Sequence, residues 1–164
     1  LVGAPLCGGR SYALLKSFFE KTLDCFGVTA DNIYSVMDKM AVEDIDNCSL
    51  SVDTRFCGTR RDPDIKGAVL QITEDNFTPQ QLTRGFLIGM CRELYSFYEQ
   101  MEKLTGKKRT HLVGSGNGVR KNKILQYYLE ETFKMPLEIP ANTEEAAFGA
   151  TAFVSRNLKN KITG

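Results

Sequence analysis

The chain has 164 residues, of which 42% are apolar and 25% are charged. These are ordinary values for a globular protein, and they exclude a disordered chain, a collagen-like fibre and a coiled coil. The 21 Lys and Arg residues nearly balance the 20 Asp and Glu residues, so the formal net charge is +1. Such a balance gives no support for a nucleic-acid partner or an acidic membrane surface. The length predicts one domain.

Five cysteines lie at positions 7, 25, 48, 57 and 91, and the chain has one histidine. No two cysteines have C-x-x-C spacing, so no structural zinc site is expected. We interpret the cysteines as reduced, mostly buried thiols of a cytoplasmic protein. No run approaches the ~18 apolar residues of a membrane span. The chain begins at Leu1, inside an apolar stretch, and this suggests a piece of a longer protein.

The first half of the chain predicts two helices and two strands. Apolar residues recur at helical spacing from Ser11 to a stop at Gly27, and a second, short helix is expected over residues 31–40. Residues 50–56 alternate apolar and polar side chains, which is typical of a strand with one buried face. A surface loop at residues 57–66 and a second strand at residues 67–72 are expected next.

The second half begins with a long predicted helix. Thr78 is a suitable N-cap and Pro79 suits the first helical position, so we expect this helix to run to Leu104, before Gly106. Gly85 and Gly89 lie four residues apart on its apolar side. Because glycine inside a helix costs about 1 kcal/mol relative to alanine, this pair predicts close packing against a neighbouring backbone.

The remaining elements alternate between strand and helix. We expect a strand at residues 110–113, a helix over residues 122–133, an extended segment at residues 135–139 and a last helix capped by Thr143. This alternation predicts an α/β layered domain.

A glycine-rich turn, G-S-G-N-G at residues 114–118, lies between a predicted strand and a predicted helix. Glycines let a ligand approach the backbone closely, and N–H groups at a helix start favour phosphate. A tight turn with nothing bound is the alternative. The turn also resembles the dinucleotide fingerprint G-x-G-x-x-G, although its last glycine falls one residue early, and Glu138 lies about where a ribose-binding acid would be. An NAD-binding oxidoreductase domain is therefore a second hypothesis, and a non-catalytic interaction domain that binds nucleotide or nothing is a third.

Three sequence blocks carry a resemblance to a known family. The first runs from Gly3-Ala4 to Gly8-Gly9 and includes L-C-G-G at residues 6–9. The second is F-x-G-x-R-x-D-P at residues 56–63, followed by K-G-A at residues 66–68. The third is G-S-G at residues 114–116, followed by Asn122, Pro136 and E-A-A-F-G-A at residues 145–150. With these blocks the chain resembles the C-terminal half of the FGGY carbohydrate kinases, which include glycerol kinase, xylulokinase and rhamnulokinase. Within this family, the first and third blocks are most similar to the sedoheptulokinase branch.

The resemblance implies an α/β fold of the ribonuclease-H-like, actin-like ATPase type. Residues 1–164 would then be the C-terminal nucleotide-binding domain of a two-domain sugar kinase that uses ATP and Mg²⁺. The sugar, a phosphate loop and the catalytic Asp that acts as general base would belong to the N-terminal part, so no catalytic residue is assigned here. Mg²⁺ prefers phosphate oxygens and waters to a dedicated protein cage, so no metal ligand is assigned either.

The resemblance also implies seven nucleotide-binding residues, namely Gly9, Ala13, Gly114, Ser115, Gly116, Asn117 and Asn122. The first two would lie against the nucleotide. The four residues of the turn would lie beneath the α-phosphate and the ribose, and the last would contact the adenine.

Overall fold

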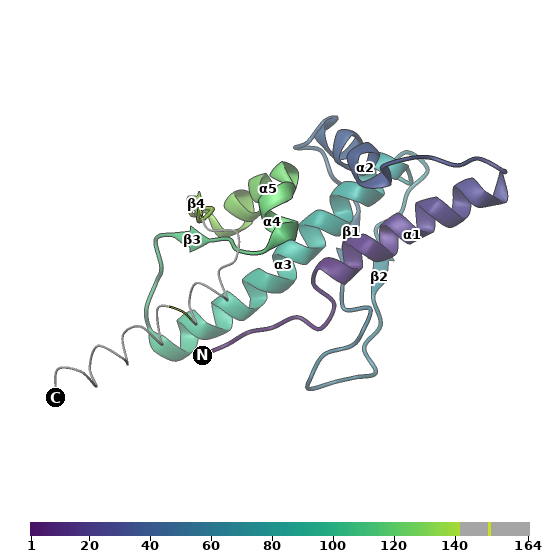
Figure 1. The fold of residues 1–164 in the computed structure, drawn as a ribbon. Helices are drawn as coiled ribbons and strands as arrows, with labels where there is room; N and C mark the ends of the chain where they lie inside the picture. Colours follow the sequence, from purple (N-terminus) through teal and green to yellow (C-terminus); the bar gives the residue numbers. More distant parts are fainter. Residues whose placement is uncertain (142–150, 152–164) are drawn as a thin grey trace.

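The computed structural model describes residues 1–141 and residue 151 (Figure 1). The predicted helix capped by Thr143, and the block at residues 145–150, lie outside these residues. In the described part, the long helix α3 (Pro79–Thr105) runs through the centre of the molecule. The helices α1 (Gly9–Cys25), α2 (Ile33–Val42) and α5 (Lys123–Phe133) contact α3.

The helix α3 begins and ends where local signals predict. The Thr78 hydroxyl accepts a hydrogen bond from the Gln81 N–H, Pro79 is the first helical residue, and Gly106 ends the helix with φ of 65°. A left-handed glycine at a helix end satisfies the last carbonyls without the steric cost of a Cβ. The predictions for α1 and for α2 are confirmed to within two residues.

The strands β1 (Ser51–Asp53) and β2 (Ala68–Leu70) form an antiparallel pair in which Val52 lies opposite Val69. The strand β1 packs directly on α3. A Cβ added to Gly89 would lie 2.3 Å from the Val52 carbonyl oxygen, and one added to Gly85 would lie 2.8 Å from Val52 Cγ2. The predicted close approach at these two glycines is therefore confirmed.

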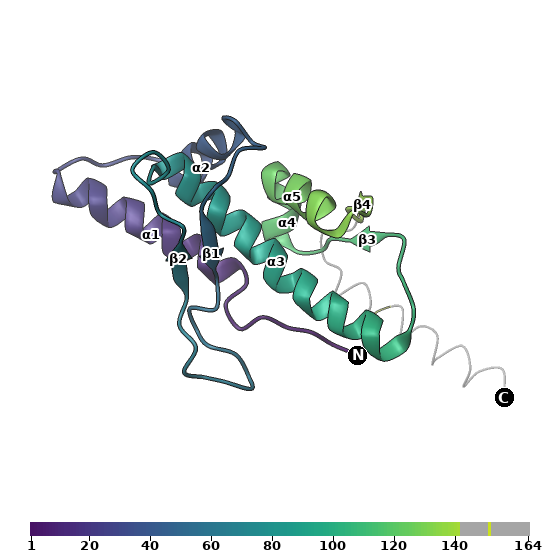
Figure 2. The ribbon, with the colours of Figure 1, turned by 180° about the vertical axis from the view of Figure 1, so that it is seen from behind.

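A second strand pair lies on the other side of α3 (Figure 2). The strands β3 (Leu112–Val113) and β4 (Leu137–Glu138) are parallel, with Leu112 opposite Leu137, and the connection between them contains α4 (Asn117–Lys121) and α5. This strand–helix–strand crossover confirms the α/β prediction. The strands are shorter than the alternation of side chains predicted. In addition, the chain turns helical at Asn117 rather than first at residue 122, and Asn122, with φ of −104° and ψ of 99°, separates the two helices.

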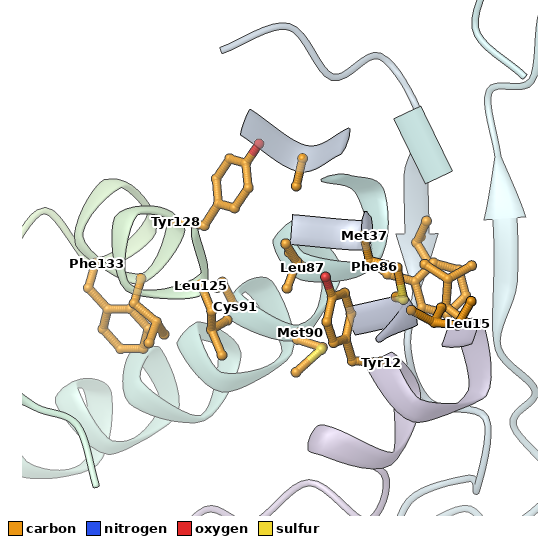
Figure 3. Close-up of a cluster of buried hydrophobic side chains, with 14 residues drawn as sticks. Tyr12, Leu15, Met37, Phe86, Leu87, Met90, Cys91, Leu125, Tyr128 and Phe133 are labelled. Carbon is orange, nitrogen blue, oxygen red and sulfur yellow. The ribbon is translucent and has the colours of Figure 1, made fainter. Parts of the chain in front are cut away.

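The core lies where the helices meet α3. Figure 3 shows buried side chains from α1, α2, α3 and α5 packed together, among them Tyr12, Leu15, Met37, Phe86, Leu87, Met90, Cys91, Leu125, Tyr128 and Phe133. This shared core fixes the start of α1 relative to the α4–α5 connection. No helix within residues 1–141 is long and apolar enough to cross a membrane.

All five cysteines are free thiols, but the expectation that they are mostly buried is wrong for two of them. Cys7 and Cys91 are buried and Cys48 is half-buried, whereas Cys25 and Cys57 are exposed. Cys25 is the last residue of α1, beyond the part of that helix that meets the core, and Cys57 belongs to the surface loop after β1.

Candidate functional site

The glycine-rich turn at residues 114–117 joins β3 to α4. Its first glycine is held by the parallel strand pair, because the Gly114 N–H donates to the Glu138 carbonyl over 2.9 Å. A Cβ at Gly114 would lie 2.8 Å from Val119 Cγ1 and 3.0 Å from side-chain carbons of Leu137 and Ile139. Gly114 is therefore required for packing, and it gives the turn a rigid base.

Gly116 is required for a different reason. It has φ of 89° and ψ of 157°, a combination that is essentially restricted to glycine, and it stands immediately before α4. A Cβ at this position would meet nothing within 4 Å. Ser115, Gly116 and Asn117 are all exposed, so the turn presents its backbone to solvent and leaves room for a ligand.

The second predicted segment is the start of α1. Gly8 precedes the helix with φ of 42°, and no side chain caps the first turn. Gly9 and Ala13 are exposed, and a Cβ on Gly9 would meet nothing within 4 Å. Both residues lie four apart on one helix face, where a ligand can approach the backbone of the first turn.

A half-buried carboxylate, that of Asp38, links α1 to Asn122, the residue that follows α4. The Tyr12 hydroxyl of α1 donates to Oδ1 of Asp38 over 3.0 Å, and Nδ2 of Asn122 donates to the same oxygen over 2.9 Å. Burial raises the pKa of the Asp38 carboxyl above its usual value, although the two hydrogen bonds oppose this shift. Burial and the neighbouring Asp38 likewise raise the pKa of Tyr12, so its hydroxyl stays protonated and remains a donor.

Asn122 has a second structural role. Its Oδ1 accepts a hydrogen bond from the Leu125 N–H over 2.8 Å, so Asn122 is the N-cap of α5. Asn122 is 9% exposed. The adenine contact stays a prediction, and it would have to use the second N–H of the amide or the second lone pair of Oδ1, since Asp38 and the Leu125 N–H occupy the others.

Sequence reasoning did not find Tyr12 or Asp38. The sequence offers one sign of Asp38, an acidic residue next to Met37 on the apolar face of α2. Its hydrogen-bond partners Tyr12 and Asn122, however, lie 26 and 84 residues away in the chain. The structure thus links α1 to the start of α5 through Tyr12 and Asp38, two residues that belong to none of the sequence blocks.

Two features of the dinucleotide hypothesis can be compared with the structure. In the fingerprint, the third glycine permits close packing between the helix and the strand. Gly118 lies within α4, and a Cβ there would meet nothing within 4 Å. Glu138 is exposed at the end of β4. The position of Glu138 is as expected for a ribose-binding acid, but Gly118 lacks the packing role.

A cavity of about 520 Å³ lies elsewhere, between residues 1–6, the loop after β1 and the second half of α3. None of the seven predicted nucleotide-binding residues lines it. Within the part of the chain that the structure describes, no group of three or more His, Cys, Asp or Glu side chains is placed to hold a metal ion.

A protein-family model described as "FGGY family of carbohydrate kinases, C-terminal domain" matches residues 28–157. The chain belongs to this family. The matched residues include the glycine-rich turn, Asp38 and Asn122. The FGGY family resemblance drawn from the three sequence blocks is therefore confirmed.

Among curated proteins, this FGGY domain is similar to the sedoheptulokinases of Homo sapiens and Mus musculus. It is 24% identical to the human protein over 162 residues and 25% identical to the mouse protein over 163 residues. In both cases the match covers 98% of this chain but only 34% of the relative. The chain thus spans about a third of the length of these relatives.

Solved structures of sugar kinases share the fold of this FGGY domain. A xylulose kinase from Bifidobacterium adolescentis matches with a TM-score of 0.62 and 20% identity, over 82% of this chain and 25% of that one. A glycerol kinase from Plasmodium falciparum, solved with ADP, matches with a TM-score of 0.64 and 16% identity, over 83% and 27% of the two chains. The predicted fold class, the α/β type of the actin-like ATPases, is confirmed.

Proposed function

We propose that this domain binds the adenosine part of ATP in a carbohydrate kinase that transfers the γ-phosphate of ATP to a sugar hydroxyl. The observation that carries the proposal is the family match, which includes the exposed, glycine-restricted turn at Gly116. Phosphoryl transfer depends mainly on positioning and on charge stabilisation. A domain whose part is to hold the adenosine needs backbone that a ligand can approach closely, and Gly9 and Gly116 both offer it.

In this proposal Gly9 and Ala13 lie against the nucleotide, and the turn from Gly114 to Asn117 lies beneath the α-phosphate and the ribose. Asn122 contacts the adenine. Mg²⁺ is held mainly by phosphate oxygens and water, which agrees with the ligand preference of this cation. The general base and the sugar-binding residues are expected outside residues 1–164, and isolated residues 1–164 are therefore expected to phosphorylate no sugar.

The substrate that we propose is sedoheptulose. Two relatives named sedoheptulokinase support this choice, although the blocks that carry the likeness face the nucleotide in our proposal rather than the sugar. Xylulose, rhamnulose and glycerol are the alternatives within the family. We further propose that the protein is cytoplasmic, because its five cysteines are free thiols.

Two measurements on the full-length protein test these proposals separately. Calorimetric titration with ATP, ADP and NAD tests the nucleotide site, and we expect binding of ATP and ADP but not of NAD. A panel of sedoheptulose, xylulose, rhamnulose and glycerol, compared by kcat/KM, tests the substrate. Preference for xylulose would assign the protein to another branch of the family but would leave the proposal of a carbohydrate kinase intact. Binding of NAD without binding of ATP would refute the kinase proposal.

A further inference from the structure

Two cysteines that are 50 residues apart in the chain meet at the start of α1. Their sulfur atoms, Sγ of Cys7 and Sγ of Cys57, are 3.3 Å apart. Cys7 lies two residues before α1, and Cys57 lies in the loop that follows β1. A disulfide bond is about 2.05 Å long, so the two sulfur atoms need to approach by little more than ~1 Å to form one.

Hydrogen bonds hold both backbones at this contact. The Ser11 hydroxyl, in the first turn of α1, donates to the Thr54 carbonyl over 3.3 Å, and this bond joins α1 to the chain just before Cys57. The Cys7 carbonyl accepts from the Arg10 N–H over 2.8 Å, which fixes Cys7 at the helix start. The meeting of the two thiols is therefore part of the packing between α1 and β1.

The loop on the Cys57 side is also closed tightly. Gly58 has φ of +69°, and a Cβ there would lie 2.5 Å from the Pro63 carbonyl oxygen. The Gly58 N–H donates to the Arg55 carbonyl over 3.0 Å. Cys57 therefore sits at the base of a compact turn rather than at a loose loop tip, and its sulfur is directed toward Cys7.

We propose that Cys7 and Cys57 form a redox-active dithiol that is oxidised to an intramolecular disulfide by a low-molecular-weight disulfide of the glutathione class. In the first step, the Cys57 thiolate attacks one sulfur of glutathione disulfide, forming a mixed disulfide and releasing one glutathione thiolate. In the second step, the Cys7 thiolate attacks the Cys57 sulfur and releases the second glutathione thiolate. The protein loses two electrons and two protons, and glutathione disulfide is reduced to two glutathione molecules.

The two thiols differ in a way that sets their order of reaction. Cys57 is exposed and can meet a bulky disulfide, whereas Cys7 is 6% exposed. Burial raises the pKa of the Cys7 thiol, an effect that outweighs the opposing contributions of Ser11 and Arg10, so Cys7 gives up its proton less readily than an ordinary thiol. Cys57 is therefore the attacking thiol and Cys7 the resolving one, because only the attacking thiol must meet the oxidant.

The bond would close a loop of about fifty residues and join the start of α1 to the end of β1. Because cross-links over long loops restrict the unfolded chain most, the oxidised protein is expected to unfold at a higher temperature than the reduced one. The contact does not belong to a metal site, since the described residues hold no group of three potential ligands. It does not depend on the proposed nucleotide site either, because neither cysteine is assigned there.

The test incubates the native full-length protein, without oxygen, in buffers of increasing ratio of glutathione disulfide to glutathione. Thiols are then blocked by alkylation at low pH, and the products are mapped by peptide mass spectrometry. We expect a Cys7–Cys57 cross-linked peptide that has lost two hydrogen atoms, preceded by a transient glutathione adduct on Cys57. A stable adduct on Cys57 without the cross-link, across the whole series, would overturn the proposal.

Three variants sharpen this test. Cys7→Ser should trap the glutathione adduct on Cys57, and Cys57→Ser should leave the buried Cys7 unmodified. Cys25→Ser is the matched control, because Cys25 is exposed like Cys57 and its removal should leave the cross-link unchanged. Should Cys7→Ser fail to fold, the unsubstituted protein still decides the question. A transient adduct on Cys57 followed by the cross-link supports the proposal, and a stable adduct without the cross-link overturns it.

Discussion

Gly116→Val is the sharpest test of the proposed nucleotide site. The backbone at Gly116, with φ of 89° and ψ of 157°, is in a region that costs a residue with a side chain about 1–3 kcal/mol. The added side chain meets no protein atom within 4 Å of its Cβ, so the fold should remain intact. If ATP binds only to the native conformation of the turn, its binding free energy must then offset the cost of holding valine in that conformation. The valine methyl groups would also occupy space beside the turn that the ligand needs. We expect ATP affinity to fall roughly 10- to 100-fold or more.

Gly118→Val is the matched control for this prediction. It adds the same atoms two residues later, inside α4, where a Cβ again meets nothing within 4 Å and no positive φ has to be kept. ATP affinity, measured by calorimetry on the full-length protein, should change little. Equal and normal affinity in both variants would show that the turn at Gly116 does not contact the nucleotide, provided that circular dichroism shows both to be folded.

Three further predictions concern stability. Gly89→Ala should destabilise the domain by about 1–3 kcal/mol in chemical denaturation, because the new Cβ would lie 2.3 Å from the Val52 carbonyl oxygen; unchanged stability would contradict the close packing of β1 on α3. The pKa of Asp38 is raised in the folded state, so the folded protein binds this proton at a higher pH than the unfolded chain does. This group therefore makes the unfolding free energy rise as pH falls toward the ordinary pKa of 3.8. Asp38→Asn should remove that rise from unfolding free energies measured by chemical denaturation over a series of acidic pH values. Asn122→Ala should lower the unfolding free energy by about 1 kcal/mol through loss of the α5 cap, whereas Asn122→Ser should retain most of it.

The boundaries of α3 were predictable because their causes are local. Thr78, Pro79 and Gly106 act within one helical turn of themselves, and the spacing of apolar residues identifies the buried face of α3. The close packing at Gly89 was predictable for a related reason, since a glycine inside a good helix needs compensation from a neighbour.

The strand lengths and the organisation of the site could not be read in the same way. Residues 50–56 alternate well, yet only Ser51–Asp53 pair with β2, because pairing depends on where the partner strand begins and ends. The division between α4 and α5 follows from the extended backbone of Asn122. That backbone is held by a side chain bound to Asp38, 84 residues earlier in the chain. Long-range bonds of this kind leave no periodic signal.

Asn122 therefore has two possible routes to affect ATP binding, and the pair of variants separates them. The direct route is the adenine contact, which both Asn122→Ala and Asn122→Ser remove. The indirect route is the placement of the turn and α4 through the cap of α5, which serine largely restores. We expect the direct route to dominate, so both variants should bind ATP more weakly by about 1–2 kcal/mol, the scale of a hydrogen bond lost from a partly buried group. Recovery of normal affinity in Asn122→Ser alone would refute the adenine contact and make Asn122 a positioning residue.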